Sequence, residues 1–483
     1  GDGGTKGSIS GDIVTGSEGT LAFDRSDEIE FGGNITGGGT LVQNGQGTLV
    51  LTGKNSHSGG TVIRHGSLQI GEGHDRGTLT GLVESGVGTK LVFNRADQVE
   101  FSGTLKGQGQ LVQKGGGITI LTGDNTYTGG TKIESGTLQL GNGGTTGNLA
   151  KSDTLNNGTL MLNLNGTHNF DGVISGSGRI NKIGTGVTTL NSDSSAFTGS
   201  TYVEGGTFAV DGKLGTTAST LNVKNGGAVN GSGIIGGTTT IESGGHLAGI
   251  QGDTLTFGHD LIFSPGANVD ISFGGKNAPA PALFDVHGDL TLAGTLKVTD
   301  LGGFSVGEYD IFNYGGTLKD NGMTLSGGEP GSLTLNTHRA NKVYLINTGG
   351  MLLNYWDGGD PSKYNNSVID GGDGVWRVGG SNSWTSKIGS PNSSWKNTDQ
   401  FAIFAGTAGT VQIDNSGGNV TVNGMQFSTD GYKITGNALT LENDSTGSAK
   451  IRVGTGNKSK EGWVATIESD LTGSATLETT DYG

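Results

Sequence analysis

Aromatic and acidic side chains gather in one short part of this 483-residue chain, between positions 355 and 395. Four of the five tryptophans are there, with tyrosines and aspartates between them. Indole and phenol rings can stack on sugars or anchor a protein partner when they are exposed, and they can equally pack together to hold a loop. The segment therefore supplies six candidate binding residues, for which packing is the alternative. These are Trp356, Trp376, Trp384, Trp395, Tyr355 and Tyr364.

Two Asp-Gly-Gly-Asp pairs in the same segment could bind a hard cation, because carboxylates on flexible turns are the oxygen ligands that Ca²⁺ prefers. The pairs are Asp357 with Asp360 and Asp370 with Asp373. They do not make a full ligand set, and the nonapeptide repeat of calcium-binding β-rolls is absent from the sequence. The four residues define a calcium hypothesis, with turn geometry as its alternative. No other cofactor is expected.

A catalytic set is harder to assemble from these residues. Ser305 lies in a G-x-S-x-G pattern, which in hydrolases presents a nucleophile on a turn between a strand and a helix, but residues 308–312 read as another strand. The eight histidines are scattered, without a spacing that would converge on zinc. We therefore expect a protein that is not an enzyme. A glycan-active lyase or hydrolase using the acidic turns is the alternative.

Composition excludes several other classes. The net charge is −15 and no cluster of lysine or arginine is present, which disfavours nucleic acid as a partner. The absence of cysteine removes disulfides and thiol catalysis together. Glycine is abundant, with 98 residues against 6 prolines, but it does not recur at every third position as in collagen. Only 31% of the residues are hydrophobic, which is too few to fill the core of a globular domain of this length easily. A solenoid needs only a thin core, so this composition favours a solenoid.

An internal repeat of 70 residues organises the first half of the chain. Residues 21–31 (LAFDRSDEIEF) align without a gap with residues 91–101 (LVFNRADQVEF), since 91 − 21 = 70. A third, less similar copy follows the second. Residues 180–190 match the second copy at an offset of 69 residues, and residues 197–210 match it at an offset of 70. Such a long period is typical of stacked repeat proteins. Three coils per repeat would give roughly 23 residues per coil.

The elements that must position these residues are short strands. Runs such as 48–51, 67–70 and 137–140 alternate with a period of two, and Gly-Gly, Asn-Gly and Gly-Xaa-Gly steps between them form corners. No segment has a sustained helical period. Parallel strands without crossover helices can pair continuously only by coiling. The sequence thus predicts an all-β fold, a single-stranded parallel β-helix that is elongated and has protruding loops.

Pattern changes along the chain suggest four regions. Residues 1–212 hold the three repeats, and residues 213–354 continue the β-helix with longer coils and a loop near residues 276–281, where two prolines are closely spaced. Residues 355–400 form the tryptophan-rich module or loop. Residues 401–483 read as further coils, truncated at their end.

Three stretches resemble the passengers of Gram-negative bacterial autotransporters that carry the passenger-associated strand repeat. They are LTGDNTYTGGTKIESGTLQLG at residues 121–141, FSVGEYDIFNY at residues 304–314, and the tryptophan-rich run with the strands after it. The resemblance implies a right-handed parallel β-helix that is displayed on the bacterial surface or secreted after cleavage. It also implies type V secretion through an outer-membrane β-barrel translocator C-terminal to this fragment.

Members of this family mostly act as adhesins, self-association factors or other host-contact proteins, although some are proteases or lipases. The resemblance therefore implies a non-enzymatic adhesin or self-association scaffold that is also an exposed antigen. The expected partners are a host cell-surface or matrix protein or glycan, further copies of the chain, and antibodies. A stalk for a functional domain outside this fragment is a further alternative.

Overall fold

The computed structural model describes residues 1–149, 151–250, 252–273, 283–302, 304–328, 331–444, 447–455 and 462–480. The loop expected near residues 276–281 lies outside this range. The chain divides into two compact units: unit 1 comprises Gly1–Leu247 and Phe257–Ala267, and unit 2 comprises Ala248–Thr256 and Asn268–Gly483. Short strands and two single-turn 3-10 helices are the regular elements of the described residues, which confirms the all-β prediction.

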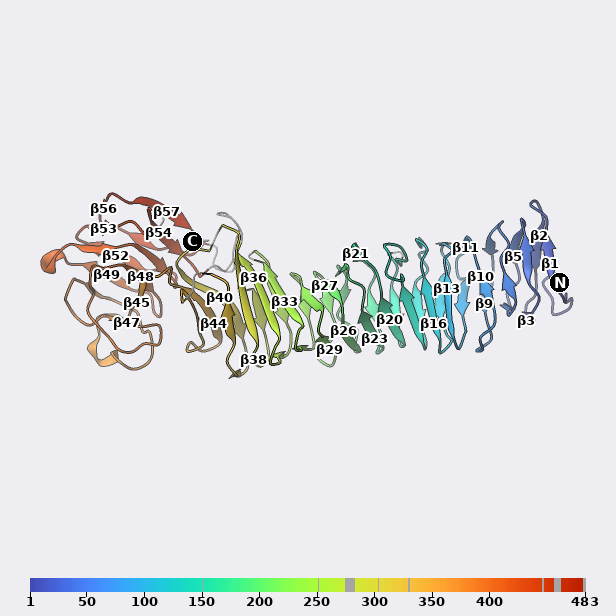
Figure 1. Ribbon diagram of the computed structural model, residues 1–483, viewed down its shortest axis with the longest axis horizontal. Coiled ribbons are helices and arrows are strands. Elements are labelled where there is room, and N and C mark those ends of the chain that lie inside the picture. Colours follow the sequence, from blue (N-terminus) through green and yellow to red (C-terminus); the bar gives the residue numbers. More distant parts are fainter. Residues whose placement is uncertain are drawn as a thin grey trace. The chain divides into compact units, whose positions relative to one another are not determined.

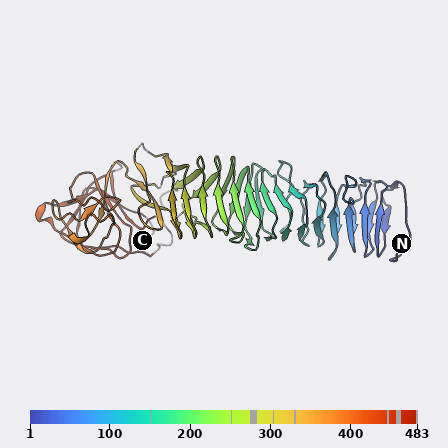
Figure 2. The ribbon, with the colours of Figure 1, turned by 90° about the horizontal axis from the view of Figure 1, so that it is seen from below.

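Unit 1 is a parallel β-helix. Each strand pairs in parallel with the strand one coil before it and one coil after it, and three successive strands, such as β4, β5 and β6, belong to three different sheets. The cross-section therefore has three faces. Figures 1 and 2 show these coils, in blue to green, following one another along the unit.

The strands of unit 1 are grouped into sheets by this coil-to-coil pairing. The first two sheets contain β1 (Ile13–Thr15), β4 (Ile35–Gly37), β7 (Lys54–Asn55), β10 (Thr78–Leu79), and β2 (Thr20–Phe23), β5 (Thr40–Gln43), β8 (Thr61–Ile63), β11 (Val83–Ser85), β14 (Leu105–Gly107). The third contains β3 (Glu28–Phe31), β6 (Thr48–Leu51), β9 (Ser67–Ile70), β12 (Lys90–Phe93), β15 (Gln110–Gln113), β17 (Thr131–Ile133), β19 (Thr154–Asn156), β22 (Ile174–Ser175). The fourth contains β13 (Gln98–Phe101), β16 (Ile118–Leu121), β18 (Thr137–Leu140), β20 (Thr159–Leu162), β23 (Arg179–Lys182), β26 (Ser200–Val203), β29 (Thr220–Val223), β32 (Thr238–Ile241), β35 (Leu261–Phe263). The remaining strands are β21 (Thr167–Phe170), β24 (Val187–Leu190), β27 (Gly206–Val210), β30 (Gly227–Asn230), and β25 (Asp193–Ser194), β28 (Lys213–Leu214), β31 (Ile234–Ile235).

The core of unit 1 is a thin column of stacked apolar side chains. Leu49, Leu68, Leu91 and Leu111 are partners in successive coils of one face, and all four are buried. Alternation along each strand places such residues inside, and the coils above and below cover them. A modest hydrophobic content is enough for this arrangement.

The 70-residue repeat does not contain a whole number of coils. Three coils on one face separate Leu49 from Leu111, a distance of 111 − 49 = 62 residues, eight fewer than the sequence period. Leu41 and its counterpart Leu111 consequently lie in different sheets, and the third-copy counterpart Ile180 lies in yet another. The expectation of three 23-residue coils per repeat was wrong. Each repeat contains three shorter coils, and its remaining residues reach the next face of the β-helix.

Turn glycines let the coils approach closely. A Cβ on Gly45 would lie 2.1 Å from the carbonyl oxygen of Arg25, and one on Gly115 would lie 2.2 Å from the backbone nitrogen of Arg95. A Cβ on the third-copy glycine, Gly184, would lie 2.3 Å from a backbone nitrogen in the same way. Any larger residue would collide with the coil beneath. This stacking explains much of the glycine content.

Unit 2 combines two kinds of strand pairing. Its first strands are β36 (Asn268–Phe273), β37 (Phe284–Val286), β38 (Leu290–Leu292), β39 (Thr295–Asp300), β40 (Gly307–Tyr314), β41 (Leu318–Asp320), β42 (Thr324–Ser326), β43 (Leu333–Asn336) and β44 (Lys342–Asn347), while β33 (His246–Ile250) and β34 (Leu255–Phe257) contain the division between the units. Strand β44 pairs antiparallel with both β40 and β43, a departure from the parallel pattern.

Coiling resumes after β44. The strands are β45 (Leu352–Trp356), β48 (Gln400–Phe404), β51 (Gly424–Phe427), β54 (Ser448–Val453), β57 (Thr476–Thr480), then β46 (Gly374–Trp376), β49 (Thr410–Ile413), β52 (Lys433–Gly436), β55 (Thr466–Ile467), β50 (Val420–Val422), β53 (Leu439–Leu441), β56 (Leu471–Gly473) and the antiparallel β47 (Trp384–Thr385); the 3-10 helices are Pro361–Lys363 and Asn415–Gly417. Trp356 pairs with Phe404, 48 residues later, whereas Phe404 pairs with Phe427 after 23. The tryptophan-rich segment is thus an insertion in a single coil.

Candidate binding site

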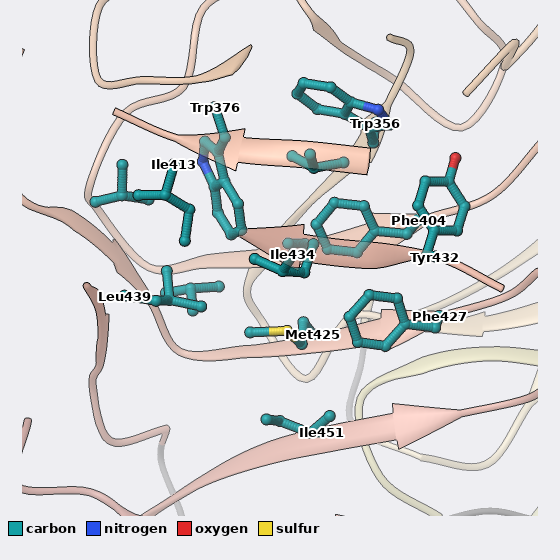
Figure 3. Close-up of a cluster of buried hydrophobic side chains, with 14 of the residues drawn as sticks. Trp356, Trp376, Phe404, Ile413, Met425, Phe427, Tyr432, Ile434, Leu439 and Ile451 are labelled. Atoms are coloured by element: carbon teal, nitrogen blue, oxygen red, sulfur yellow. The ribbon is translucent and has the colours of Figure 1, made fainter. Parts of the chain in front are cut away.

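The four tryptophans of the inserted segment form one buried cluster. Trp384 is the centre, with ring centroids 5.2 Å from Trp356, 5.1 Å from Trp376 and 4.5 Å from Trp395. Each indole is at most 1% exposed. The cluster continues into the coil core through Phe404, which stacks on Phe427 (Figure 3).

This geometry favours packing over ligand contact for the tryptophans. The rings meet edge to face or tilted, as aromatic side chains do in protein interiors. Trp356 Nε1 donates to the Gly372 carbonyl at 2.8 Å, and Trp395 Nε1 donates to Asn397 and to the Thr421 carbonyl. The inserted segment covers the core of the coil that holds Phe404, and the four indole faces are not available at the surface.

The two tyrosines have different surroundings. Tyr355 is buried and its hydroxyl donates to Glu308 Oε1 at 2.8 Å. Tyr364 is half-buried, and its hydroxyl lies 3.1 Å from both the Gly358 carbonyl and Ser383 Oγ. Both phenols therefore fix protein groups in this structure.

The four aspartates are occupied by donors from the protein itself. Buried Asp357 accepts from the backbone nitrogen of Asp370 at 2.8 Å and from Asn392, and burial raises its pKa. Asp360 caps the 3-10 helix Pro361–Lys363. Asp370 accepts from Asn366, and Asp373 accepts from the backbone nitrogen of Thr410 at 2.7 Å.

Some of these aspartate contacts are local turn contacts, as at Asp360, and others join distant segments, as between Asp373 and Thr410. No group of three or more histidine, aspartate or glutamate side chains suited to a metal ion occurs in the described part of the chain. The acidic turns tie neighbouring loops together and place the inserted segment on the coil. The calcium hypothesis keeps its four residues but gains no further ligand from the parts of the chain that the structure describes.

Buried ion pairs beside the cluster were not anticipated from the sequence. Glu308 and Asp310 are two residues apart on β40, and both carboxylates are buried. Arg339 Nη1 lies 3.0 Å from Glu308 Oε2, and Lys342 Nζ lies 2.7 Å from Asp310 Oδ2. Burial opposes ionisation of Arg339, but the charge of Glu308 and the contacts with Tyr344 and Tyr355 together raise the arginine's pKa. Paired charges of this kind can be buried because each neutralises the other.

Further contacts hold strand β40 in place. The side-chain amide of Gln426 bonds both the backbone nitrogen and the carbonyl of Glu308, at 2.8 and 3.0 Å. The Thr455 hydroxyl donates to Asp310 Oδ2 at 3.2 Å. The guanidinium of Arg452 lies over the Tyr309 ring, 4.2 Å from its centroid. Strand β40 is consequently buried on both sides. The alternating carboxylates of Glu308 and Asp310 would instead have predicted that one side of the strand faces solvent.

A pocket of about 490 Å³ opens next to these ion pairs, and we call it the basic pocket. Its wall includes four basic side chains, hydroxyl groups and aromatic rings. These are His338, Arg339, Lys342, Lys387, Ser367, Ser428, Thr429, Thr455, Tyr344 and Trp463. Val368 and Ile388 are exposed apolar residues of the same wall. Among the described residues that line it there is no carboxylate.

The basic pocket could not have been found in the sequence. Its residues extend from position 338 to position 463, and only the stacking of coils brings them together. The sequence pattern changes after residue 355. This change marks the inserted segment, but it does not indicate the pocket. Local patterns report alternation and turns, whereas a concave wall depends on contacts between distant segments.

Comparison with known proteins finds a family model that matches three stretches of the chain. The passenger-associated-transport-repeat family matches residues 41–70, 111–140 and 180–210, the three copies found in the sequence. These three stretches therefore carry the passenger-associated-transport repeat. Each matched copy combines two or more short strands with glycine turns.

Three relatives of this passenger-repeat chain illustrate its range. The adhesin BmaC autotransporter of Brucella suis biovar 1 is 36% identical over 383 residues, which cover 78% of this chain and 11% of that protein. The autotransporter adhesin/invasin TibA of Escherichia coli O78:H11 is 30% identical over 137 residues, 28% of this chain and 13% of TibA. An extracellular serine protease of Serratia marcescens is 33% identical over 106 residues, 22% of this chain and 10% of the protease.

This chain therefore spans about a tenth of the length of the curated relatives it matches. As a passenger segment it is exposed at the cell surface or secreted. The described residues contain no helix with the length and hydropathy needed to cross a bilayer.

Proposed function

We propose that this passenger segment is a non-enzymatic adhesin that contacts host surfaces or neighbouring bacteria and is an exposed antigen. The observation that carries the proposal is the 36% identity with an adhesin autotransporter over 78% of the chain. The expected partners are a host cell-surface or matrix protein or glycan, or a second copy of the chain.

The fold supports this role because a β-helix aligns side chains of successive coils in rows along its surface. In unit 1, Val62, Glu84 and Lys106 are partners in three successive coils, and all three line a groove of about 560 Å³ with His65. Repeated shallow contacts of this kind suit weak, multivalent binding, in which avidity grows with the number of sites.

An enzymatic role has one observation in its favour, the relation to a secreted serine protease, which covers 22% of this chain. The G-x-S-x-G serine does not strengthen it. Ser305 Oγ lies 3.2 Å from the Tyr309 hydroxyl, and its backbone nitrogen donates to the same oxygen. The serine is part of a turn that leads into β40.

The adhesin proposal is tested by displaying the chain on a non-adherent bacterial strain and measuring attachment to several host cell types and to immobilised matrix proteins. We expect increased attachment, or clumping of the displaying bacteria, relative to a strain that displays an unrelated β-helix. No increase in either assay, with surface display verified by antibody, would contradict the proposal. Hydrolysis of a polysaccharide or casein panel by the purified chain would favour the enzymatic alternative.

A further inference from the structure

The basic pocket differs in charge from the rest of the chain. The chain has 44 acidic and 29 basic lysine or arginine residues, yet the described wall of this pocket has four basic side chains and no carboxylate. Arg339 and Lys342 are each paired with a carboxylate beneath the wall, so they are held in place there. Since Glu308 and Asp310 neutralise these two side chains, the net positive charge of the wall comes from Lys387, and it can select a ligand by charge.

Lys387 is the basic side chain that can neutralise a ligand. It is half-buried, and burial lowers its pKa. No carboxylate pairs with its ammonium group within the residues the structure describes, whereas the carbonyl of Lys387 accepts from Asn336 at 3.0 Å and fixes the backbone. A half-buried ammonium without a counter-charge gains most when an anion enters.

The remaining wall fits a ring with hydroxyl groups. Ser367 and Thr429 supply hydroxyl oxygens, and Trp463 supplies aromatic surface, while the Tyr344 ring is buried beneath Arg339. Amphipathic rings of this kind pack against the C–H faces of sugars, and side-chain hydroxyls orient the sugar hydroxyls. A volume of about 490 Å³ is within the usual range for small-ligand sites and is ample for one sugar unit.

We propose that the basic pocket binds an acidic sugar, a monosaccharide unit of a surface glycan that carries a carboxylate or a sulfate. The acidic group pairs with Lys387, and the ring lies against the aromatic part of the wall. The inference names a ligand class for the adhesin role proposed above and rests on it.

The test uses the full 483-residue chain in calorimetric titrations with N-acetylneuraminic acid and with glucose 6-sulfate, which separate the carboxylate from the sulfate. N-acetylmannosamine and glucose are the neutral counterparts, and an acidic tripeptide is a third arm. We expect at least one charged sugar to bind tenfold or more tightly than its neutral counterpart. Equal binding of charged and neutral sugars, or tightest binding of the tripeptide, would overturn the proposal.

Two variants locate the site. Lys387→Gln removes the charge, and Val368→Trp fills the mouth from a side chain that is 53% exposed. Each is expected to weaken binding at least tenfold, while Lys396→Gln, at an exposed lysine outside the pocket, leaves it unchanged. Unchanged affinity in Val368→Trp, with an unaltered melting curve, would show that the sugar binds elsewhere.

Display of the same variants separates this inference from the adhesin proposal. If displaying bacteria attach to host cells and the Lys387→Gln and Val368→Trp variants attach equally well, the pocket proposal fails and the adhesin role stands. If the purified chain binds the acidic sugar but display gives no attachment, the pocket stands and the adhesin role fails.

Discussion

The Nζ atom of Lys182 donates to turn carbonyls at the repeat position where Gln113 does so one copy earlier. Gln113 Nε2 donates to the carbonyls of Gly115 and Gly117, and Lys182 donates to those of Gly184 and Gly205. Both side chains are buried. A neutral amide has thus been replaced by an ammonium group at an interior position.

Replacing Lys182 with glutamine should stabilise unit 1 at neutral pH. Burial lowers the pKa of Lys182 to about 8 from an ordinary value of 10.5. Since the unfolded chain binds the proton more tightly, stability should rise with pH between about 8 and 10.5 and be lowest below 8. We expect Lys182→Gln to raise the free energy of unfolding by about 1–3 kcal/mol at pH 7 and to remove its dependence on pH between about 8 and 10.5. Urea titrations at several pH values measure both effects. The reverse change, Gln113→Lys, should destabilise unit 1. An increase in stability in that variant would contradict the explanation.

His57 should make the first repeat sensitive to acid. Its Nε2 lies 2.9 Å from Thr61 Oγ1, and the next copy makes the same contact with Tyr127 and Thr131 at 2.5 Å. Burial lowers the pKa of His57 below its ordinary 6.5, so the unfolded chain takes up a proton first and stability falls as the pH drops below that value. We expect His57→Tyr to reduce the difference in unfolding midpoint between pH 8 and pH 5, and Tyr127→His to increase it. Equal pH profiles for all three proteins would show that this position does not titrate on unfolding.

Gly115 and Gly116 offer a matched pair of substitutions. A Cβ on Gly115 would collide with the backbone of Arg95, whereas one on Gly116 meets open space. We expect Gly115→Ala to cost about 1–3 kcal/mol or more, and Gly116→Ala to leave stability unchanged or to raise it by up to about 1 kcal/mol. Thermal unfolding followed by circular dichroism measures both. Similar midpoints for the two variants would mean that the coils can separate at little cost.

Glu308 should be essential to the stability of unit 2. Glu308→Gln leaves the partly buried guanidinium of Arg339 without its counter-charge, which costs up to about 3–5 kcal/mol. Glu468→Gln is the matched control, because Glu468 pairs with Lys433 at the surface, where a loss of at most about 1 kcal/mol is expected. Guanidinium titrations compare the two. An equal effect of both substitutions would argue against the buried pair.

Trp376 and its neighbour Val375 test the role of the tryptophan cluster. Trp376 is buried, 5.0 Å from Trp395 and 5.7 Å from Phe404 between ring centroids, and Val375 on the same strand is 42% exposed. We expect Trp376→Ala to cost about 3–5 kcal/mol and to reduce the near-ultraviolet circular dichroism, and Val375→Ala to change neither. Loss of ligand binding in Trp376→Ala with a native melting curve would restore the binding interpretation of the cluster.

The four tryptophans and the two Asp-Gly-Gly-Asp pairs can be recognised in the sequence, but their roles cannot. Trp356 and Trp384 stand out by composition, and nothing in the local pattern tells an exposed ring from a buried one. Burial was decided by the pairing of Trp356 with Phe404, 48 residues away, which folds the inserted segment over the core. The basic pocket and the ion pair of Glu308 with Arg339 depend on the same long-range pairing.

The sequence by itself determined the parallel β-helix, because two-residue alternation and glycine corners are local signals that each coil repeats. It also determined the repeat and its three copies. Only the tertiary structure decided that each 70-residue copy turns by one face, since the coil length is set by which backbone groups hydrogen-bond between coils. The same holds for the site: side chains from residues 338 to 463 form one pocket because stacked coils bring them together, and no local pattern encodes that contact.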